Sequence, residues 1–271
     1  MEFWQNIYSQ FDPVAFNLGP VAVHWYGIMY ALALLSAIYV AKLLIKYDKL
    51  AIPNDLFDSY VWWAEIGVIL GARIGYILFY DTQTSYYLTH PWQIFNPFVN
   101  GEYVGIAGMS YHGAFIGFLI ASILFCKKHK VSFWFLADIS VLGISAAYVF
   151  GRIGNFFNQE LIGRETDVPW GILIDGVLRH PSQLYEAFLE GILIFIILFA
   201  IRKRKAFDGQ LAIYYGILYS IARITAEFFR EPDIQLGFLY GGWLTMGMLI
   251  SGIFAIISIG FLFILKKNSK N

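Results

Sequence analysis

The sequence predicts an all-α integral membrane protein with seven transmembrane helices, organised as a single polytopic membrane domain over residues 1–271. Hydrophobic residues make up 58% of the chain and charged residues 14%, whereas soluble domains have roughly 45–50% and about 25%. Two long runs also lack Asp, Glu, Lys and Arg, 29 residues over 13–41 and 32 residues over 234–265. Because about 20 apolar residues cross a bilayer, these runs argue against a water-soluble enzyme.

Hydropathy, interrupted by basic residues, places the helices in order along the chain. They are expected near 20–43, 58–80, 111–126, 134–150, 184–201, 210–229 and 242–265. Basic clusters follow the first, third, fifth and seventh helices and contain 13 of the 19 basic residues, including every lysine. The positive-inside rule therefore predicts an outside N-terminus and a cytoplasmic C-terminus. The N-terminus has no basic region before Lys42, so no cleaved signal is expected.

Two long connections fall on the outer side in this topology and would form a small periplasmic subregion. Residues 81–110 are rich in Tyr, Trp and Phe and contain two prolines, which is typical of a segment lying in the membrane interface. Residues 161–183 are the most polar stretch outside the helices. Within them, residues 171–179 predict a small hairpin closed by an Asp175-Gly176 turn.

Cysteine content and net charge exclude several classes of function. The single Cys126 excludes an internal disulfide and a metal site built from several cysteines. The formal net charge of zero gives no reason to expect a nucleic-acid partner. No zinc-ligand spacing, P-loop or Gly-x-Ser-x-Gly motif occurs.

The basic residues outside the clusters are all arginines, and all fall on the outer half or in outer loops. They are Arg73, Arg152, Arg164, Arg179, Arg223 and Arg230. Ionisable groups within spans are costly and usually face a partner or a cavity. In the 210–229 helix the spacing of the polar residues places them on one face, and they are Tyr219, Arg223, Glu227 and Arg230. This face predicts either a structural Arg–Glu pair or an arginine wall for an anionic ligand, with Glu227 orienting the guanidinium groups.

Further polar residues gather at the ends of other predicted helices. The 134–150 helix ends in Gly151-Arg152-Ile153-Gly154-Asn155, followed by Glu160 and Gly163, and glycine lets a backbone approach a ligand closely. His112 opens the 111–126 helix, ahead of a stripe of small residues suited to tight packing, Gly113, Gly117 and Ala121. His112 could be a general base or a structural hydrogen-bonding residue.

The predicted topology brings residues from several helices to one outer membrane face, namely Tyr26, His112, Arg152, Glu160, Arg223 and Glu227. Together they predict a cationic, partly buried cavity open to the outer leaflet, with an anionic phospholipid as guest. A transporter or flippase for an anionic lipid or solute could use the same arginine-lined cavity. A non-catalytic membrane scaffold would leave the outer arginines without a role.

With these motifs, nearly the whole chain resembles the prolipoprotein diacylglyceryl transferase family. The most specific match runs from Gly151-Arg152-Ile153-Gly154-Asn155-Phe156 through Glu160, Gly163 and Arg164. Further matches are His24-Trp25-Tyr26-Gly27, Gly71 to Tyr80, His112-Gly113, His180 to Glu186 and Arg223 to Arg230. Two positions depart from the family pattern: Ala114 replaces a second glycine after the histidine, and Gln159 replaces a glycine before the glutamate.

The resemblance implies a bacterial inner-membrane transferase with its active site toward the periplasm. It would move the diacylglyceryl group of phosphatidylglycerol to the lipobox cysteine of a prolipoprotein and release glycerol phosphate, with no cofactor or metal. Arg152 and Arg223 would hold the departing phosphate, and Glu160 and Glu227 would hold the arginines. The candidate base is His112. The residues expected to line the lipid site are Tyr26, Arg152, Asn155, Gly163, Tyr219 and Arg230.

Overall fold

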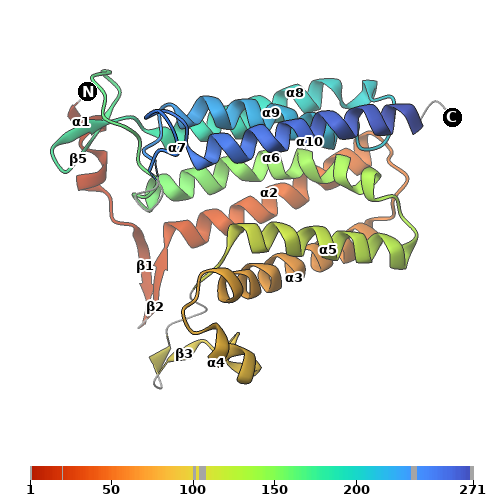
Figure 1. Cartoon of the computed structure of the whole chain (residues 1–271), viewed down its shortest axis with the longest axis horizontal. Helices are drawn as coiled ribbons and strands as arrows, with labels where there is room; N and C mark the ends of the chain where they lie inside the picture. The colour runs from red at the N-terminus through yellow and green to blue at the C-terminus, as the bar shows by residue number, and fades with distance from the viewer. Residues whose placement is uncertain (1, 20, 100–101, 104–107, 233–236, 269–271) are drawn as a thin grey trace. The chain divides into compact units, whose positions relative to one another are not determined.

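The structure is a computed structural model that describes the chain except residues 1, 20, 100–101, 104–107, 233–236 and 269–271 (Figure 1). It divides into two compact units. The larger unit consists of Met1–Leu50 and Trp134–Asn271, and the smaller unit is Ala51–Phe133. The organisation as a single polytopic domain stays a prediction.

The structure is mostly helical, and six helices within its described part are long and apolar enough to cross a membrane. They are Trp25–Tyr47, Asn54–Phe79, Tyr111–His129, Phe133–Phe157, Ser182–Arg204 and Met246–Lys267. The remaining expected helix is present as α9 (Gln210–Glu227) but is not among the six, because its polar residues lower its hydropathy. The seven-span count and the orientation of the termini therefore stay predictions.

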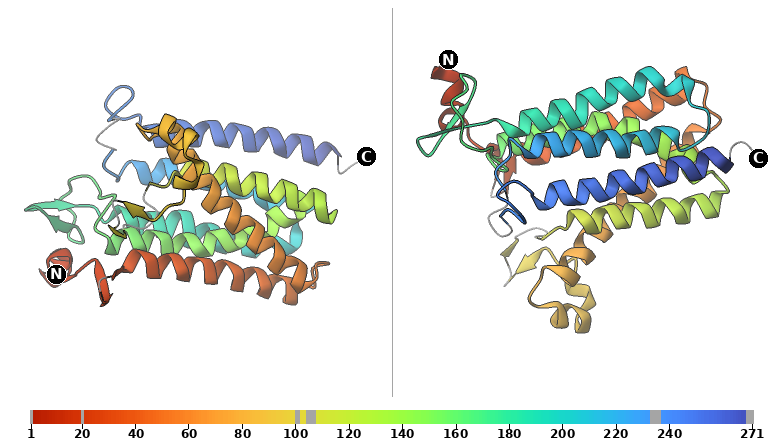
Figure 2. Two further views of the ribbon diagram at one scale, coloured as in Figure 1. Left: turned by 90° about the horizontal axis from the view of Figure 1, so that it is seen from below. Right: turned by 45° about the horizontal axis from the view of Figure 1, so that its top comes forward.

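Long helices lie side by side in the larger unit (Figures 1 and 2). They are α2 (Trp25–Tyr47), α6 (Phe133–Phe157), α8 (Ile194–Ile201), α9 and α10 (Met246–Asn268). The helix that ends as α8 begins as α7 (Ser182–Glu186), continues through the π-helical turn η3 (Ala187–Leu193) and is followed by η4 (Arg202–Arg204). Buried apolar residues from α2, α6, α8 and α9 form the core of the larger unit, among them Leu44, Leu142, Leu198 and Leu211.

Successive helices of this unit run in opposite directions, so each end of the unit collects a defined set of termini. At one end, Gly154 of α6 lies against Tyr26 and Met29 of α2, and Gly247 of α10 lies against Glu227 of α9. At the other end, Arg202 forms an ion pair with Asp48 at 2.8 Å. The basic residues that follow α2 and α8 therefore share an end, as expected from the sequence, although the side of the membrane that this end faces stays a prediction.

Short elements cover the end that carries Tyr26 and Glu227. They are α1 (Glu2–Gln5), η1 (Ile7–Gln10), the hairpin of β1 (Val14–Leu18) and β2 (Val21–His24), and the hairpin of β5 (Ile172–Ile174) and β6 (Val177–Arg179). The second hairpin confirms the prediction for residues 171–179. Its turn residues Asp175 and Gly176 have φ of 51° and 79°, the positive values that a two-residue hairpin turn of this kind requires.

In the smaller unit, α3 (Asn54–Phe79) packs against α5 (Tyr111–His129) through facing glycines. A Cβ at Gly117 would lie 2.9 Å from the Cα of Gly71, so the backbones touch only because both side chains are absent. This contact confirms the predicted small-residue stripe. The segment that connects α3 to α5 along the chain contains α4 (Thr84–Thr89), η2 (Pro91–Gln93) and the strand pair β3 (Phe98–Val99) and β4 (Glu102–Tyr103).

Arg73 of α3 is buried and anchors this connection within the smaller unit. Its Nε donates to the carbonyl of Ile94 at 2.5 Å, and its guanidinium lies over the ring of Tyr87. These contacts tie Arg73 to the segment that follows α3. Tyr86 and Trp92 of the connection are exposed, and their placement in the membrane interface stays a prediction.

Candidate active site

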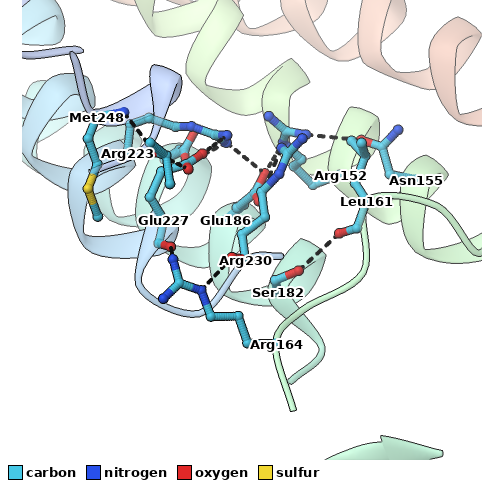
Figure 3. A network of polar contacts seen from close by, with 12 residues as sticks. Arg152, Asn155, Leu161, Arg164, Ser182, Glu186, Arg223, Glu227, Arg230 and Met248 are labelled. Atoms are coloured by element: carbon cyan, nitrogen blue, oxygen red, sulfur yellow. Dashed lines mark hydrogen bonds and ion pairs between the residues drawn. The ribbon is translucent and has the colours of Figure 1, made fainter. Parts of the chain in front are cut away.

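The arginines predicted from sequence meet around one buried carboxylate, Glu186, in the larger unit (Figure 3). Within the described structure, three arginines form ion pairs with it: Arg152 at 2.8 Å, Arg223 at 3.1 Å and Arg230 at 3.7 Å. Arg152 comes from α6, Arg223 from α9 and Arg230 from the turn after α9, whereas Glu186 ends α7. The antiparallel order of the helices brings these four residues together at one end.

Arg152 reaches a second carboxylate through a tyrosine. Its Nε donates to the hydroxyl of Tyr148 at 2.9 Å, and that hydroxyl donates to Glu190. Tyr148 lies one turn before Arg152 on α6, and Glu190 lies one turn after Glu186 in η3. The guanidinium of Arg152 therefore has its orientation set from two adjacent helices.

Arg223 is paired with Glu227 one turn later on α9, as the sequence predicted. Glu227 also accepts a hydrogen bond from the Thr245 hydroxyl at 2.6 Å. On the other side, Arg223 lies 3.6 Å from Glu190. Glu227 thus holds Arg223 from one direction while Glu186 and Glu190 approach it from the other.

Burial makes this cluster electrostatically unusual. Glu186 and Glu190 are completely buried, while the side chains of Arg152, Arg223 and Arg230 keep 15%, 11% and 10% of their exposure. Three guanidinium groups face three carboxylates here, so the region is closer to charge balance than the cationic cavity expected from sequence. No group of three or more His, Cys, Asp or Glu side chains in the described part of the chain could hold a metal ion.

Several buried atoms of the cluster still lack a hydrogen bond of good geometry within the described structure. They are both carboxylate oxygens of Glu186, Oε1 of Glu190 and one terminal nitrogen of Arg223. Such unsatisfied groups are rare in folded proteins, because leaving one buried costs about 1–3 kcal/mol. These atoms take part in ion pairs instead, such as the 2.8 Å contact of Glu186 with Arg152 and the 3.6 Å contact of Glu190 with Arg223.

Asn155 connects the cluster to Glu160. The carbonyl oxygen of the Asn155 amide accepts from Arg152 at 3.3 Å, and its nitrogen donates to Glu160 at 2.8 Å. The contact described between Glu160 and Arg152 therefore runs through Asn155, whereas the sequence had suggested that Glu160 holds the arginines itself. Tyr26, near the start of α2, lies against Gly154, the residue before Asn155.

Gly163 and Arg164 join the segment after α6 to the end of α9. Gly163 pairs with Arg230 in a β-bridge, and the Arg164 guanidinium donates to the carbonyls of Arg230 and Glu227, each at 2.9 Å. A Cβ at Gly163 would lie 2.8 Å from that of His180, so this position requires glycine for close packing. Burial lowers the pKa of His180, against a raising effect of Asp167.

Two other predicted site residues, Tyr219 and His112, are described by their ring and hydrogen-bond contacts. The ring of Tyr219 packs against those of Tyr148 and Tyr215, at centroid distances of 5.9 and 5.8 Å. His112 belongs to the smaller unit, where it is exposed and its Nδ1 lies 3.5 Å from the Tyr80 hydroxyl. The function of His112 as a base stays a prediction.

Three residues of the cluster were not among the site residues predicted from sequence: Tyr148, Glu186 and Glu190. Both glutamates lie within the apolar run 184–201, where a charged residue is costly and calls for a partner. Their spacing of four residues places them on one helical face, the same signal that identified Arg223 and Glu227. Tyr148 carried no such signal, because a tyrosine in a span is usually a packing or interface residue.

Comparisons with known proteins identify the family of the chain. A family model described as prolipoprotein diacylglyceryl transferase matches residues 13–264. A phosphatidylglycerol–prolipoprotein diacylglyceryl transferase of Aliarcobacter butzleri is 75% identical over 267 residues, which cover 98% of each chain. Proteins of the same name are 58% identical in Campylobacter lari, over the whole of both chains, and 64% identical in Wolinella succinogenes, over 92% of this chain and 91% of the relative. The chain therefore belongs to the prolipoprotein diacylglyceryl transferase family.

Proposed function

We propose that this transferase moves the diacylglyceryl group of phosphatidylglycerol to the thiol of a lipobox cysteine in a prolipoprotein, the first step of bacterial lipoprotein maturation. The observation that carries the proposal is the meeting of three arginines around the buried Glu186. Guanidinium groups bind phosphate through parallel hydrogen bonds, and this reaction releases a phosphate ester.

The chemistry sets what the site must supply. The sulfur attacks the saturated carbon of the diacylglyceryl group that is bonded to a phosphate oxygen. A sulfur–carbon bond forms while the bond between that carbon and the phosphate oxygen breaks. The bonding electrons leave with the oxygen of glycerol phosphate, and the thiol proton passes to a base. A free cysteine has a pKa near 8.5, so the base matters at neutral pH. Because no tetrahedral intermediate forms, the site needs stabilisation of the departing phosphate rather than an oxyanion hole.

Arg152 and Arg223 are the residues we assign to the departing phosphate. Arg152 has the most exposed side chain of the three arginines, and its 3.3 Å hydrogen bond to Asn155 is long enough to exchange for a phosphate oxygen. Glu186 would keep both guanidinium groups at a fixed separation, and Glu227 would hold Arg223 from behind. Fixed donors of this kind stabilise a developing anion without reorganisation.

The lipid would lie along the residues that surround this pair, namely Tyr26, Asn155, Gly163, Tyr219 and Arg230.

His112 is the proposed base. Replacement of His112 by glutamine should lower turnover, while unchanged turnover would make it a structural residue. We also propose a bacterial inner-membrane location with seven spans, and a site that faces the periplasm.

The test is transfer of label from phosphatidylglycerol to a lipobox peptide by the purified full-length protein. Label should appear on the cysteine peptide and not on its Cys→Ser version, with release of glycerol phosphate in equal amount. A folded sample that binds the lipid but transfers nothing would contradict the proposal and favour the lipid-transporter alternative. Accelerated movement of labelled lipid between vesicle leaflets would then support that alternative.

A further inference from the structure

The segment that follows α6 has an unusual backbone on both sides of Glu160. Gln159 and Leu161 have φ of 56° and 57°, in the left-handed region that residues other than glycine seldom adopt. Two such residues around one carboxylate cost free energy and persist only where the surroundings hold them. The contacts of this segment show what holds it.

The end of helix α6 holds the backbone of Gln159 and Glu160 through two hydrogen bonds. The amide of Gln159 donates to the carbonyl of Phe156, and the amide of Glu160 donates to that of Asn155, both at 3.1 Å. This pair of bonds is the Schellman pattern, in which the residue after the cap takes the left-handed conformation. Glycine is preferred there because it has no Cβ. The departure from the family pattern at Gln159 therefore falls on the one position where glycine would be least strained.

The side chain of Gln159 supplies what glycine cannot. Its amide nitrogen donates to the carbonyl of Tyr8 at 3.1 Å and to that of Phe11 at 3.0 Å, which uses both of its hydrogens. The N-terminal segment, nearly 150 residues away in sequence, is thereby bound to the residue before Glu160. Aromatic packing continues the contact, since Tyr8 lies against Phe156 and Phe11 against Phe157, with ring centroids 5.2 and 4.7 Å apart.

The next two residues of the segment, Glu160 and Leu161, accept hydrogen bonds through their backbone carbonyls. Gln183, which is buried, donates to the carbonyl of Glu160 at 2.6 Å and to the Tyr8 hydroxyl at 3.3 Å. The Ser182 hydroxyl donates to the carbonyl of Leu161 at 3.0 Å. Residues 159 to 161 are thus fixed one after another, by the N-terminal segment and by the start of α7.

We propose that Gln159 is a positioning residue that binds the N-terminal segment to the end of α6 and so fixes Glu160, and through Asn155 the phosphate-holding Arg152. This inference rests on the proposed function for its catalytic consequence. Its structural part does not, because the contact between Gln159 and the segment around Tyr8 and Phe11 can be measured without turnover.

Replacement of Gln159 by glycine separates positioning from helix capping. A capping role predicts that Gln159→Gly keeps or raises both the thermal midpoint and the activity, since glycine suits the left-handed position. A positioning role predicts an unchanged or higher midpoint with a fall in kcat/KM of roughly tenfold, because two hydrogen bonds are lost. Amide hydrogens of residues 7–11 should also exchange roughly tenfold faster in the full-length variant.

A matched control is Lys130→Gly, which replaces another non-glycine residue with positive φ (56°) at the end of a long helix, α5. It should alter neither turnover nor exchange at residues 7–11. The double variant Gln159→Gly/Glu160→Gln should be no slower than Glu160→Gln alone, because both changes act through the same carboxylate. Unchanged exchange at residues 7–11 in Gln159→Gly, or additive losses in the double variant, would overturn the proposal. Failure of the wild-type protein to transfer label would instead contradict the proposed function.

Discussion

The two ends of the larger unit both contain buried carboxylates among basic side chains, yet they satisfy them differently. At one end, Asp138 accepts hydrogen bonds from Lys205 and from the backbone amides of Gly209 and Ala212, all at 2.9–3.0 Å. At the other end, Glu186 has three arginines within ion-pair distance, but neither of its oxygens has a hydrogen bond of good geometry in the described structure.

This difference separates a structural ion pair from a site prepared for a ligand. Asp138 uses its acceptors on the first turn of α9, which fixes that helix against α6. Around Glu186, three guanidinium groups face three carboxylates, and the arginines come from α6, α9 and the turn after α9. A buried charge must be paired, and Asp138 meets this requirement through hydrogen bonds, whereas Glu186 meets it through ion pairs with side chains that are also suited to bind phosphate.

The largest expected effect is that of Arg223→Lys. Transfer of label to the lipobox peptide should fall by roughly a hundredfold or more, because an ammonium group cannot reproduce the planar pair of hydrogen bonds to phosphate. Arg202→Lys, at the Asp48 end, is the matched control and should leave kcat/KM within about twofold, since this ion pair lies at the opposite end of the larger unit from Glu186. Equal losses in the two variants would remove the distinction between the ends.

Glu186→Gln should reduce transfer by roughly tenfold to a hundredfold. The neutral amide leaves the arginines without the charge that spaces them, and its own N–H groups point at other donors. Glu165→Gln serves as the control, because Glu165 is 71% exposed and lies 3.8 Å from Arg179. The two purified variants can be compared by initial rates with labelled phosphatidylglycerol. Wild-type rates in Glu186→Gln would show that the glutamate is not needed to arrange the site.

Asp138→Asn should lower stability rather than catalysis. We expect the free energy of unfolding to fall by about 2 kcal/mol, since the amide cannot accept from Lys205 and both backbone amides at full strength. Thermal unfolding in detergent measures the change, and the activity per folded molecule should stay constant. A loss of specific activity at full stability would make this end part of the active site.

The same end should respond to alkaline pH. Burial lowers the pKa of Lys205, but hydrogen bonds to Asp208 and Asp138 outweigh it and raise that pKa above its usual value. The resulting stability is complete below about pH 10 and is lost as pH rises through the folded pKa. The thermal midpoint of the wild-type protein should therefore fall as the pH rises above about 10, and Asp138→Asn should show a smaller fall.

The smallest expected effect concerns His180, beside Gly163. Because burial lowers its pKa, the folded state favours the neutral ring, and stability is lost as pH falls from about 6.5 through the folded pKa. Thermal midpoints measured at pH 7.5 and pH 5.5 should differ less in His180→Gln than in the wild-type protein. An identical difference in both would assign the acid sensitivity to other groups.

Much of this architecture could be predicted from the sequence because it depends on local patterns. Apolar length predicted the helices, the Asp175-Gly176 pair predicted a hairpin, and the spacing of Arg223 and Glu227 predicted their ion pair. The glycines of α5 predicted tight helix packing, and the structure shows that the partner helix is α3. Each of these signals lies within a single turn, hairpin or helix face, where spacing alone decides which side chains meet.

The centre of the site depended on contacts between distant segments. That Glu186 would receive arginines from α6 and α9, and that Tyr148 would connect Arg152 to Glu190, followed only from the packing of three helices. Likewise, the sequence identified Gln159 as a departure, but its contacts with Tyr8 and Phe11 span nearly 150 residues. The sequence by itself determined the helices, the charges within them and the family. Tertiary structure alone decided which charges meet, because the partners of a buried group are set by packing in three dimensions rather than by distance along the chain.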